Sequence, residues 1–256
     1  GLYDAAGAPW GQDSSQSPAL RIAVVAYPHI SNLDEFQVLR QLPGVRLRWA
    51  RSAVELDGAH WIILPGSKQV SGDLAWLRAH GLDASIRRHA AANRPLLGIC
   101  GGLQMLGHTL YDPDGVDGEA GAPQPGLGLL AVHTRYAAPK RVCAQAARFQ
   151  CLVPPWQVLS GVAADGYEIR TGVTTESAPG SQHASTATVL RGTRGEAIGW
   201  QNGAVLGIYL HGLFESAAVV RSLFGRKVVS LDDNLDALAD MVEESFGAGG
   251  LSALCL

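Results

Sequence analysis

The stretch from Leu96 to Gly107 limits most strongly how this chain can fold. The short run Leu96–Ile99 leads directly into Cys100, and two glycines and then Leu103–Leu106 follow it. A strand that turns at once into a helix lifts the residue at the turn above the sheet edge, and neighbours without a Cβ relieve the crowding. A helix N-terminus also stabilises a nearby thiolate. The pattern therefore predicts a nucleophile elbow with Cys100 as the nucleophile.

Two other interpretations of this stretch stay open. In one, Cys100 is a small buried core residue, and the glycines only permit close packing of the strand and the helix. In the other, the glycine-rich turn binds phosphate, as turns between a strand and a helix can. A Walker motif needs Lys followed by Ser or Thr after its last glycine, whereas Leu103 and Gln104 follow Gly102, and this argues against phosphate.

A thiol nucleophile needs a base, and His211 is the histidine best placed to act as one. It follows directly after the apolar run Val205–Leu210, which is typical of a strand. His29 and His108 lie near a strand end or the elbow helix, and they stay open as supporting groups. Solvated or hydrogen-bonding roles are expected for four others, which lie in helical or loop segments: His60, His80, His89 and His183.

A third segment, Trp61–Leu64, is an apolar run that ends at Pro65-Gly66. The backbone N–H groups of this turn, together with the N–H of Gly101, would form an oxyanion hole for a tetrahedral intermediate. Taken alone, the segment also fits an ordinary turn.

The order of the predicted elements indicates an α/β fold. One helix is expected to begin at Ser31 or Asn32 as its cap and to bury four apolar side chains: Leu33, Phe36, Leu39 and Leu42. A second helical stretch would bury Leu74, Leu77, Leu82 and Ile86. Alternation of strands with these helices implies a mostly parallel central sheet flanked by helices. The strands of this part are expected at 22–26, 45–49, 61–64 and 95–99. Further extended segments, in the same sheet or at its antiparallel edge, are expected at 129–131, 167–169, 197–200 and 205–210.

The chain divides into a central domain and two tails. Residues 1–20 are rich in Gly, Ser, Pro and Gln without periodicity and are expected to form a linker or tail. Residues 21–246 would form one domain, and 247–256 a C-terminal tail. Residues 171–189 have no apolar period and are expected to form a mobile loop. The last helix would start at Asp232 or Asp233 and bury Leu235, Leu238 and Val242.

Composition limits the partners. Lys and Arg number 20 against 23 Asp and Glu, so no basic surplus favours nucleic acid. There is no apolar run near the ~20 residues that a membrane-spanning helix needs, and no leader pattern, so we expect a cytoplasmic protein without a membrane partner.

The four cysteines have no C-x-x-C or metal-ligand spacing and are expected to be reduced thiols without a metal: Cys100, Cys143, Cys151 and Cys255.

Together these segments resemble the triad-type, or class I, glutamine amidotransferases. Their nucleophile motif G-x-C-x-G-x-Q is matched by Gly98, Cys100, Gly102 and Gln104. Within that superfamily the chain is similar to the amidotransferase domains of the cobyric acid synthase family, over five blocks that span about residues 21–245. The blocks are 27–36, 64–68, 98–102, 166–169 and 209–214.

The resemblance implies a flavodoxin-like fold and a glutaminase reaction. Cys100 would attack the side-chain amide of glutamine, form a γ-glutamyl thioester and release ammonia, while His211 relays the proton. Gly66 and Gly101 would hold the oxyanion, and Gln104 would help to bind glutamine. No cofactor or metal is expected in this domain. ATP and Mg are expected in an N-terminal or separate synthetase domain, which would amidate peripheral carboxylates of a corrinoid, adenosylcobyrinic acid a,c-diamide, to give cobyric acid in cobalamin biosynthesis.

Two positions depart from the family pattern. In the better-studied triad enzymes a glutamate follows two residues after the histidine, where this chain has Leu213. Glu215 and Glu168 are the candidates for the third member of the triad, and the prediction is otherwise a dyad of Cys100 and His211. The resemblance also predicts a histidine at the position of Arg170.

Other functions fit part of the pattern. The same chemistry would serve a peptidoglycan-precursor amidotransferase or cobyrinic acid a,c-diamide synthase, but the block 27–32 favours the cobyric acid synthase family. A catalytically silent, partner-binding domain is a non-enzyme alternative, against which the intact Cys100, Gln104 and His211 argue. A hydrolase of esters or peptides on the same elbow would leave Gln104 and the other blocks unexplained.

Overall fold

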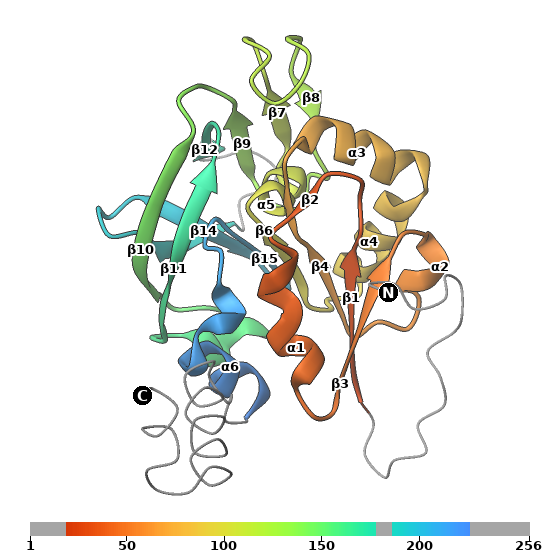
Figure 1. Cartoon of the computed structure of the whole chain (residues 1–256), viewed down its shortest axis with the longest axis vertical. Helices are drawn as coiled ribbons and strands as arrows, with labels where there is room; N and C mark the ends of the chain where they lie inside the picture. Colours follow the sequence, from red (N-terminus) through yellow and green to blue (C-terminus); the bar gives the residue numbers. More distant parts are fainter. Residues whose placement is uncertain (1–18, 178–185, 226–256) are drawn as a thin grey trace, which may run out of the picture.

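The computed structural model describes residues 19–177 and 186–225, and a nine-stranded sheet forms its centre (Figure 1). The predicted tail up to residue 18, the predicted last helix and the predicted tail 247–256 lie outside the described residues. The predicted domain start at Arg21 falls one residue inside the first strand, which begins at Leu20.

The central sheet is mixed. Five neighbouring strands run parallel in the order β15 (Val205–Ile208), β6 (Leu96–Ile99), β4 (Trp61–Leu64), β1 (Leu20–Val25) and β3 (Val45–Ala50). Beyond β15 the directions alternate through β14 (Ala197–Asn202), β13 (Ala187–Arg191), β10 (Arg141–Phe149) and β11 (Ala163–Arg170). The predicted α/β class is confirmed, and the sheet is parallel on one side of β15 and antiparallel on the other.

Helices cover the sheet as two groups. One group is α2 (Ala53–Leu56), α3 (Val70–Ala79), α4 (Leu82–Ala91) and α5 (Gly101–Leu106), in which α4 contacts α2 and α3, and α3 also contacts α5. The other is the 3-10 helix η1 (Leu33–Phe36), α1 (Gln37–Gln41), η3 (Leu213–Glu215) and α6 (Ala217–Phe224). A further 3-10 helix, η2 (Trp156–Leu159), contacts α6. Coverage by helices explains why β6 and β15 are buried along their whole length.

Two small sheets complete the fold. One has the order β12 (Val173–Glu176), β9 (Val132–Arg135), β7 (Thr109–Tyr111) and β8 (Gln124–Pro125). The other pairs β2 (Ile30–Ser31) with β5 (Gly66–Ser67) in antiparallel fashion. The second sheet matters for the site, because β5 contains the turn after β4.

Two predicted segments were wrong. Residues 129–131 form a bend, and the strand starts only at Val132. The segment 171–189, predicted as a mobile loop, contains β12 and the start of β13, while its part 178–185 lies outside the described residues. Polar contacts hold β12 in place, since the Thr174 hydroxyl shares a hydrogen bond of 2.6 Å with Thr134 of β9, and an apolar period does not detect such a strand.

Helical segments also differ in detail from the prediction. The helix expected after Asn32 starts as η1. Asn32 is its N-cap residue with a φ of 56°, but its side chain makes no capping hydrogen bond to the helix. Its amide instead donates to the Tyr167 hydroxyl at 2.7 Å. The apolar stretch from Leu74 to Ile86 forms two helices, because Gly81 between them takes a φ of 67° that ends the first.

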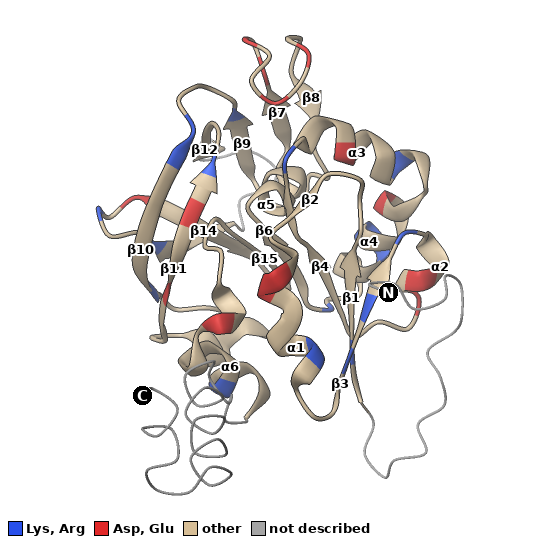
Figure 2. Cartoon of the chain, in the orientation of Figure 1, with Lys and Arg blue, Asp and Glu red and all other residues tan. Residues whose placement is uncertain are grey.

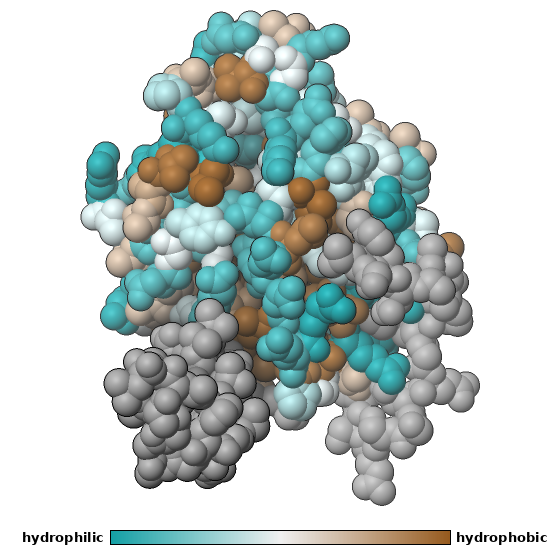
Figure 3. Space-filling model, viewed as in Figure 1, coloured by the Kyte–Doolittle hydropathy of each residue, from teal (hydrophilic) through white to brown (hydrophobic). Residues whose placement is uncertain are grey.

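The surface carries both charges without a dominant sign. Lys and Arg residues are distributed over β3, α1, β10 and α6 rather than gathered on one face of the described chain (Figure 2). The face seen in Figure 3 is mostly polar, with small, separated apolar patches. In the described part of the chain, none of the helices has the length and apolar character that crossing a membrane requires.

Replacing Gly102 by alanine tests the close packing of α5 on β4. An added Cβ would lie 2.0 Å from the Leu64 carbonyl oxygen, so strand and helix must separate. We expect Gly102→Ala to destabilise the fold by about 1–3 kcal/mol, as overpacking does, measured by urea unfolding. Gly121→Ala is the control, because its nearest atom would lie 3.9 Å away. Equal stability of the two variants would contradict this account of the packing.

Candidate active site

The neighbouring parallel strands bring the candidate residues to one edge of the sheet. Cys100 follows β6, His211 lies three residues beyond β15, and Gly66 lies two residues beyond β4. These strands are neighbours in the order β15-β6-β4. Because parallel strands end at the same edge, the three segments meet there although up to 145 residues separate them in sequence.

Cys100 occupies the predicted strand-to-helix turn. Its φ of 51° and ψ of −107° lie in a region that residues with a side chain rarely adopt. An added Cβ on Gly98 would lie 2.5 Å from Leu106 and 2.8 Å from the backbone of Gly102. The glycines are therefore required by packing, as the sequence predicted.

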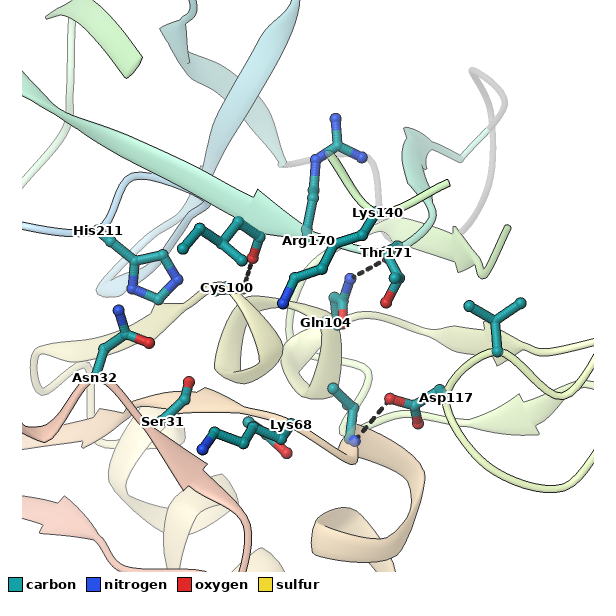
Figure 4. Close-up of a pocket in the computed structure, with 14 residues that line it drawn as sticks. Ser31, Asn32, Lys68, Cys100, Gln104, Asp117, Lys140, Arg170, Thr171 and His211 are labelled. Atoms are coloured by element: carbon teal, nitrogen blue, oxygen red, sulfur yellow. Dashed lines mark hydrogen bonds between the residues drawn. The ribbon is translucent and has the colours of Figure 1, made fainter. Parts of the chain in front are cut away.

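The thiol lines a pocket of about 370 Å³ (Figure 4). Cys100 is 6% exposed, and its Sγ donates to the Ile169 carbonyl oxygen at 3.0 Å. The remaining lining side chains come from several elements and include His211, Gln104 and Arg170. Lys68, Lys140 and Asp117 also line the pocket, so that both charges are present around it.

His211 is held in place beside the thiol pocket by strand β11. Its backbone N–H donates to the Tyr167 carbonyl at 2.8 Å, and the Tyr167 N–H donates back at 3.2 Å. The two rings stack with centroids 5.3 Å apart. Gly66 lies against the same ring, because an added Cβ would be 3.1 Å from His211 Cε1.

A carboxylate that the sequence analysis did not select faces His211. Glu35 of η1 places Oε1 at 3.5 Å from His211 Nδ1, and both side chains are 1% exposed. Its other oxygen accepts the Gly212 N–H at 3.3 Å. The contact between the two side chains is an ion pair, and within the described residues neither Glu35 Oε1 nor His211 Nδ1 has a hydrogen-bond partner. The signal in the sequence was weak: Glu35 is a charged residue directly before the buried Phe36, within the block 27–36 that resembles the family.

The charge state of His211 follows from these neighbours. Burial disfavours the charged ring, but the close approach of Cys100 and Glu35 and their negative charges outweigh burial and raise the pKa of His211 to about 10. An imidazolium at neutral pH is the form that can protonate a leaving group.

The two carboxylates predicted as third member lie elsewhere. Glu168 is fully buried, accepts hydrogen bonds from Arg170 and, at 2.7 Å, from Gln145, and forms an ion pair with Arg141 at 3.2 Å, so its charge is neutralised within β10 and β11. Glu215 is exposed at the end of η3, and the structure has no hydrogen bond or ion pair between it and His211. Glu35 is the carboxylate that the fold brings to the ring.

Gln104 lies in the pocket wall, but its side chain is bonded to the protein. The amide donates to the Tyr209 hydroxyl at 3.1 Å and to the Thr171 carbonyl at 3.3 Å, and its oxygen accepts from Tyr136 at 3.3 Å. Arg170, where the resemblance predicted a histidine, lies over the Tyr209 ring at 4.4 Å. Both residues thus support the wall around Cys100.

The other candidate histidines belong to different clusters. His29 contacts the Asp73 carboxylate at 3.0 Å, and His108 packs edge-on against His133 with centroids 5.8 Å apart. Over residues 19–177 and 186–225 there is no group of three or more His, Cys, Asp or Glu side chains arranged to hold a metal ion.

The sequence matches a known protein family and curated relatives of it. Residues 21–219 match the model of the CobB/CobQ-like glutamine amidotransferase domain. The chain is 54% identical to a cobyric acid synthase of Methylibium petroleiphilum over 99% of its length and 52% identical to one of Leptothrix cholodnii, again over 99%. It spans about half the length of these curated relatives, 50% and 49% respectively.

Solved structures share the fold. PurLQS from Thermotoga maritima superposes with a TM-score of 0.60 at 17% identity, over 81% of this chain and 98% of that one. A glutamine amidotransferase structure superposes with a TM-score of 0.54 at 18% identity, over 75% and 89% of the two chains. With the family match over most of the described residues, the conclusion is that this chain belongs to the CobB/CobQ-like glutamine amidotransferase domain family.

Proposed function

We propose that this chain hydrolyses the side-chain amide of glutamine through a thioester on Cys100. The observation that carries the proposal is the buried arrangement at the sheet edge: a thiol on a strained elbow, His211 beside the same pocket, and Glu35 at 3.5 Å behind the ring. Residues of these three types, placed in this order, activate a thiol for acyl transfer.

In the reacting state His211 already holds the proton of the Cys100 thiol, in line with its raised pKa, and Cys100 Sγ attacks the amide carbon of glutamine as a thiolate. The substrate must displace the hydrogen bond from Sγ to the Ile169 carbonyl. Negative charge develops on the amide oxygen, and the backbone N–H groups of Gly101 and of the Gly66 turn are the donors that would stabilise it. Glu35 stabilises the imidazolium and fixes its orientation, as a buried carboxylate does in related triads.

The intermediate then collapses toward products. The C–N bond breaks as His211 gives its proton to the leaving nitrogen. Ammonia departs, and a γ-glutamyl thioester remains on Cys100. Water, deprotonated by the now neutral His211, attacks the thioester carbon, and glutamate leaves as the thiol regains its proton.

Charges around the pocket suit the zwitterionic end of glutamine. The ammonium groups of Lys68 and Lys140 have no salt-bridge partner among the described residues, and Figure 4 shows the Lys140 side chain extending over the pocket. We infer that they attract the α-carboxylate, while the Asp117 carboxylate, which also accepts the Val70 and Ser71 N–H groups, favours the α-ammonium group.

The acceptor of the ammonia is inferred from the relatives. Proteins named cobyric acid synthase match nearly the whole chain at 54% and 52% identity and are about twice its length. We propose that ammonia serves an ATP- and Mg-dependent synthetase region, which amidates peripheral carboxylates of adenosylcobyrinic acid a,c-diamide to give cobyric acid.

Cys100→Ser is expected to abolish glutamine hydrolysis, because a serine hydroxyl in this position lacks the acidity of a thiol. In the unsubstituted protein, a diazo-ketone analogue of glutamine should label Cys100, as mapped by mass spectrometry. Cys151→Ser is the control, since Cys151 is exposed and does not line the pocket. Labelling of Cys151 or Cys143 in place of Cys100 would overturn the assignment of the nucleophile.

Glu35→Gln is expected to lower kcat by about tenfold or more and to shift the alkaline limb of the pH profile to lower pH. The carboxylate charge favours the imidazolium, so its removal lowers the pKa of His211 from about 10 toward the ordinary value. The protonated ring, which must protonate the leaving nitrogen, is then lost at lower pH. Glu215→Gln is the matched control and should leave the profile unchanged. If Glu215→Gln shifted the limb and Glu35→Gln did not, the third member would be misassigned.

The proposed acceptor predicts coupled activity. This chain alone should hydrolyse glutamine slowly, and adding the synthetase region of a relative together with ATP and the corrinoid diamide should raise turnover. Ammonia release and corrinoid amidation would be measured in the same reaction. An unchanged rate, or amidation of a peptidoglycan precursor but not of the corrinoid, would argue for a different acceptor.

A further inference from the structure

A single buried carboxylate holds the turn that contains Gly66. Asp73 of α3 is 0% exposed and accepts the Ser67 hydroxyl at 2.6 Å, the His29 backbone N–H at 3.1 Å and His29 Nδ1 at 3.0 Å. Ser67 Oγ in turn accepts the Gln69 N–H at 3.0 Å. An ionised carboxylate without such donors would be costly to bury, so the three donors and Asp73 form one unit.

This unit joins two segments that are far apart in sequence. Ser67 belongs to β5 and His29 directly precedes β2, and these two strands pair with each other. The Lys68 N–H also donates to the His29 carbonyl at 2.8 Å. Asp73 therefore fixes both strands of the small sheet at the point where the chain leaves β4.

The turn held by Asp73 lies directly against the reacting groups. An added Cβ on Gly101 would be 2.8 Å from the Ser67 backbone nitrogen, and one on Gly66 would be 3.1 Å from His211 Cε1. Gly101 follows the nucleophile, so the Ser67 backbone packs beside one oxyanion donor. A small displacement of Ser67 would move the N–H groups of this turn relative to the oxyanion.

We propose that Asp73 is a positioning residue for the oxyanion hole, which acts through Ser67 and His29 and does not touch the substrate. The proposal rests on the proposed glutaminase function. A purely structural role also fits a buried acidic residue in the first turn of α3, and the two roles predict different kinetics. Loss of one oxyanion donor lowers kcat by about 100-fold to 1,000-fold, whereas a structural role would lower stability alone.

The test compares two reactions of Cys100 in this chain, with the synthetase region of a relative, the corrinoid acceptor and ATP added. Asp73→Asn keeps the shape of the side chain but removes its charge. We expect kcat for glutamine hydrolysis to fall by about tenfold or more, a partial loss of the oxyanion contribution, with KM changed by less than about twofold. Alkylation of Cys100 by iodoacetamide should keep its rate, because displacement of iodide develops no oxyanion. Ser67→Ala should show the same split, and Asp83→Asn on the neighbouring helix is the control.

Two results would overturn the proposal. One is a kcat for Asp73→Asn equal to that of the unsubstituted protein. The other is a parallel fall of hydrolysis and alkylation rates, which would indicate general loss of structure. If Asp73→Asn fails to fold, Ser67→Ala alone is the test: it should lower kcat for glutamine hydrolysis but keep the rate of Cys100 alkylation. Failure of the proposed function itself would be seen separately, as hydrolysis that persists in Cys100→Ser.

Discussion

The site depends on the shared direction of four neighbouring strands, β15, β6, β4 and β1. Each ends at the same edge of the sheet, so the residues that follow them must meet. The packing of α5 on β4 and β6 then sets the height of Cys100, because Gly98 and Gly102 leave no room for a side chain. The backbone strain at Cys100 is held by this packing and by the hydrogen bond from its N–H to the Ile208 carbonyl at 2.8 Å.

Three buried carboxylates around this edge have different surroundings and therefore different roles. Glu168 is neutralised by Arg170 and Arg141, and the Arg170 guanidinium lies on the Tyr209 ring that supports Gln104. Asp73 is satisfied by three donors from the strands around the Gly66 turn. Glu35 alone keeps an oxygen aimed at His211. Buried carboxylates are costly unless they are paired, so each one marks a place where the geometry is tightly fixed.

The sequence predicted the parts of the site that short patterns encode. Cys100 with its glycines, and His211 at the end of an apolar strand, could be selected because each lies next to a recognisable strand and parallel strands bring such ends together. Glu35 could not, because its partner is 176 residues away and the contact depends on how η1 packs on η3. The long strand β10 was also missed, since its exposed face is rich in alanine and one of its buried residues is Gln145. Polar pairing hides such strands from an analysis based on apolar periodicity.

If Cys100 is the nucleophile, glutamine turnover passes through a thioester on Cys100, and trapping that species tests this assignment most directly. The protein would be mixed with glutamine, quenched in acid during steady-state turnover and digested, and the peptides would be analysed by mass spectrometry. We expect a glutamyl group on the peptide that contains Cys100, removable by hydroxylamine and absent when glutamate replaces glutamine. Ammonia release with an unmodified Cys100, or a glutamyl group on another residue, would contradict it.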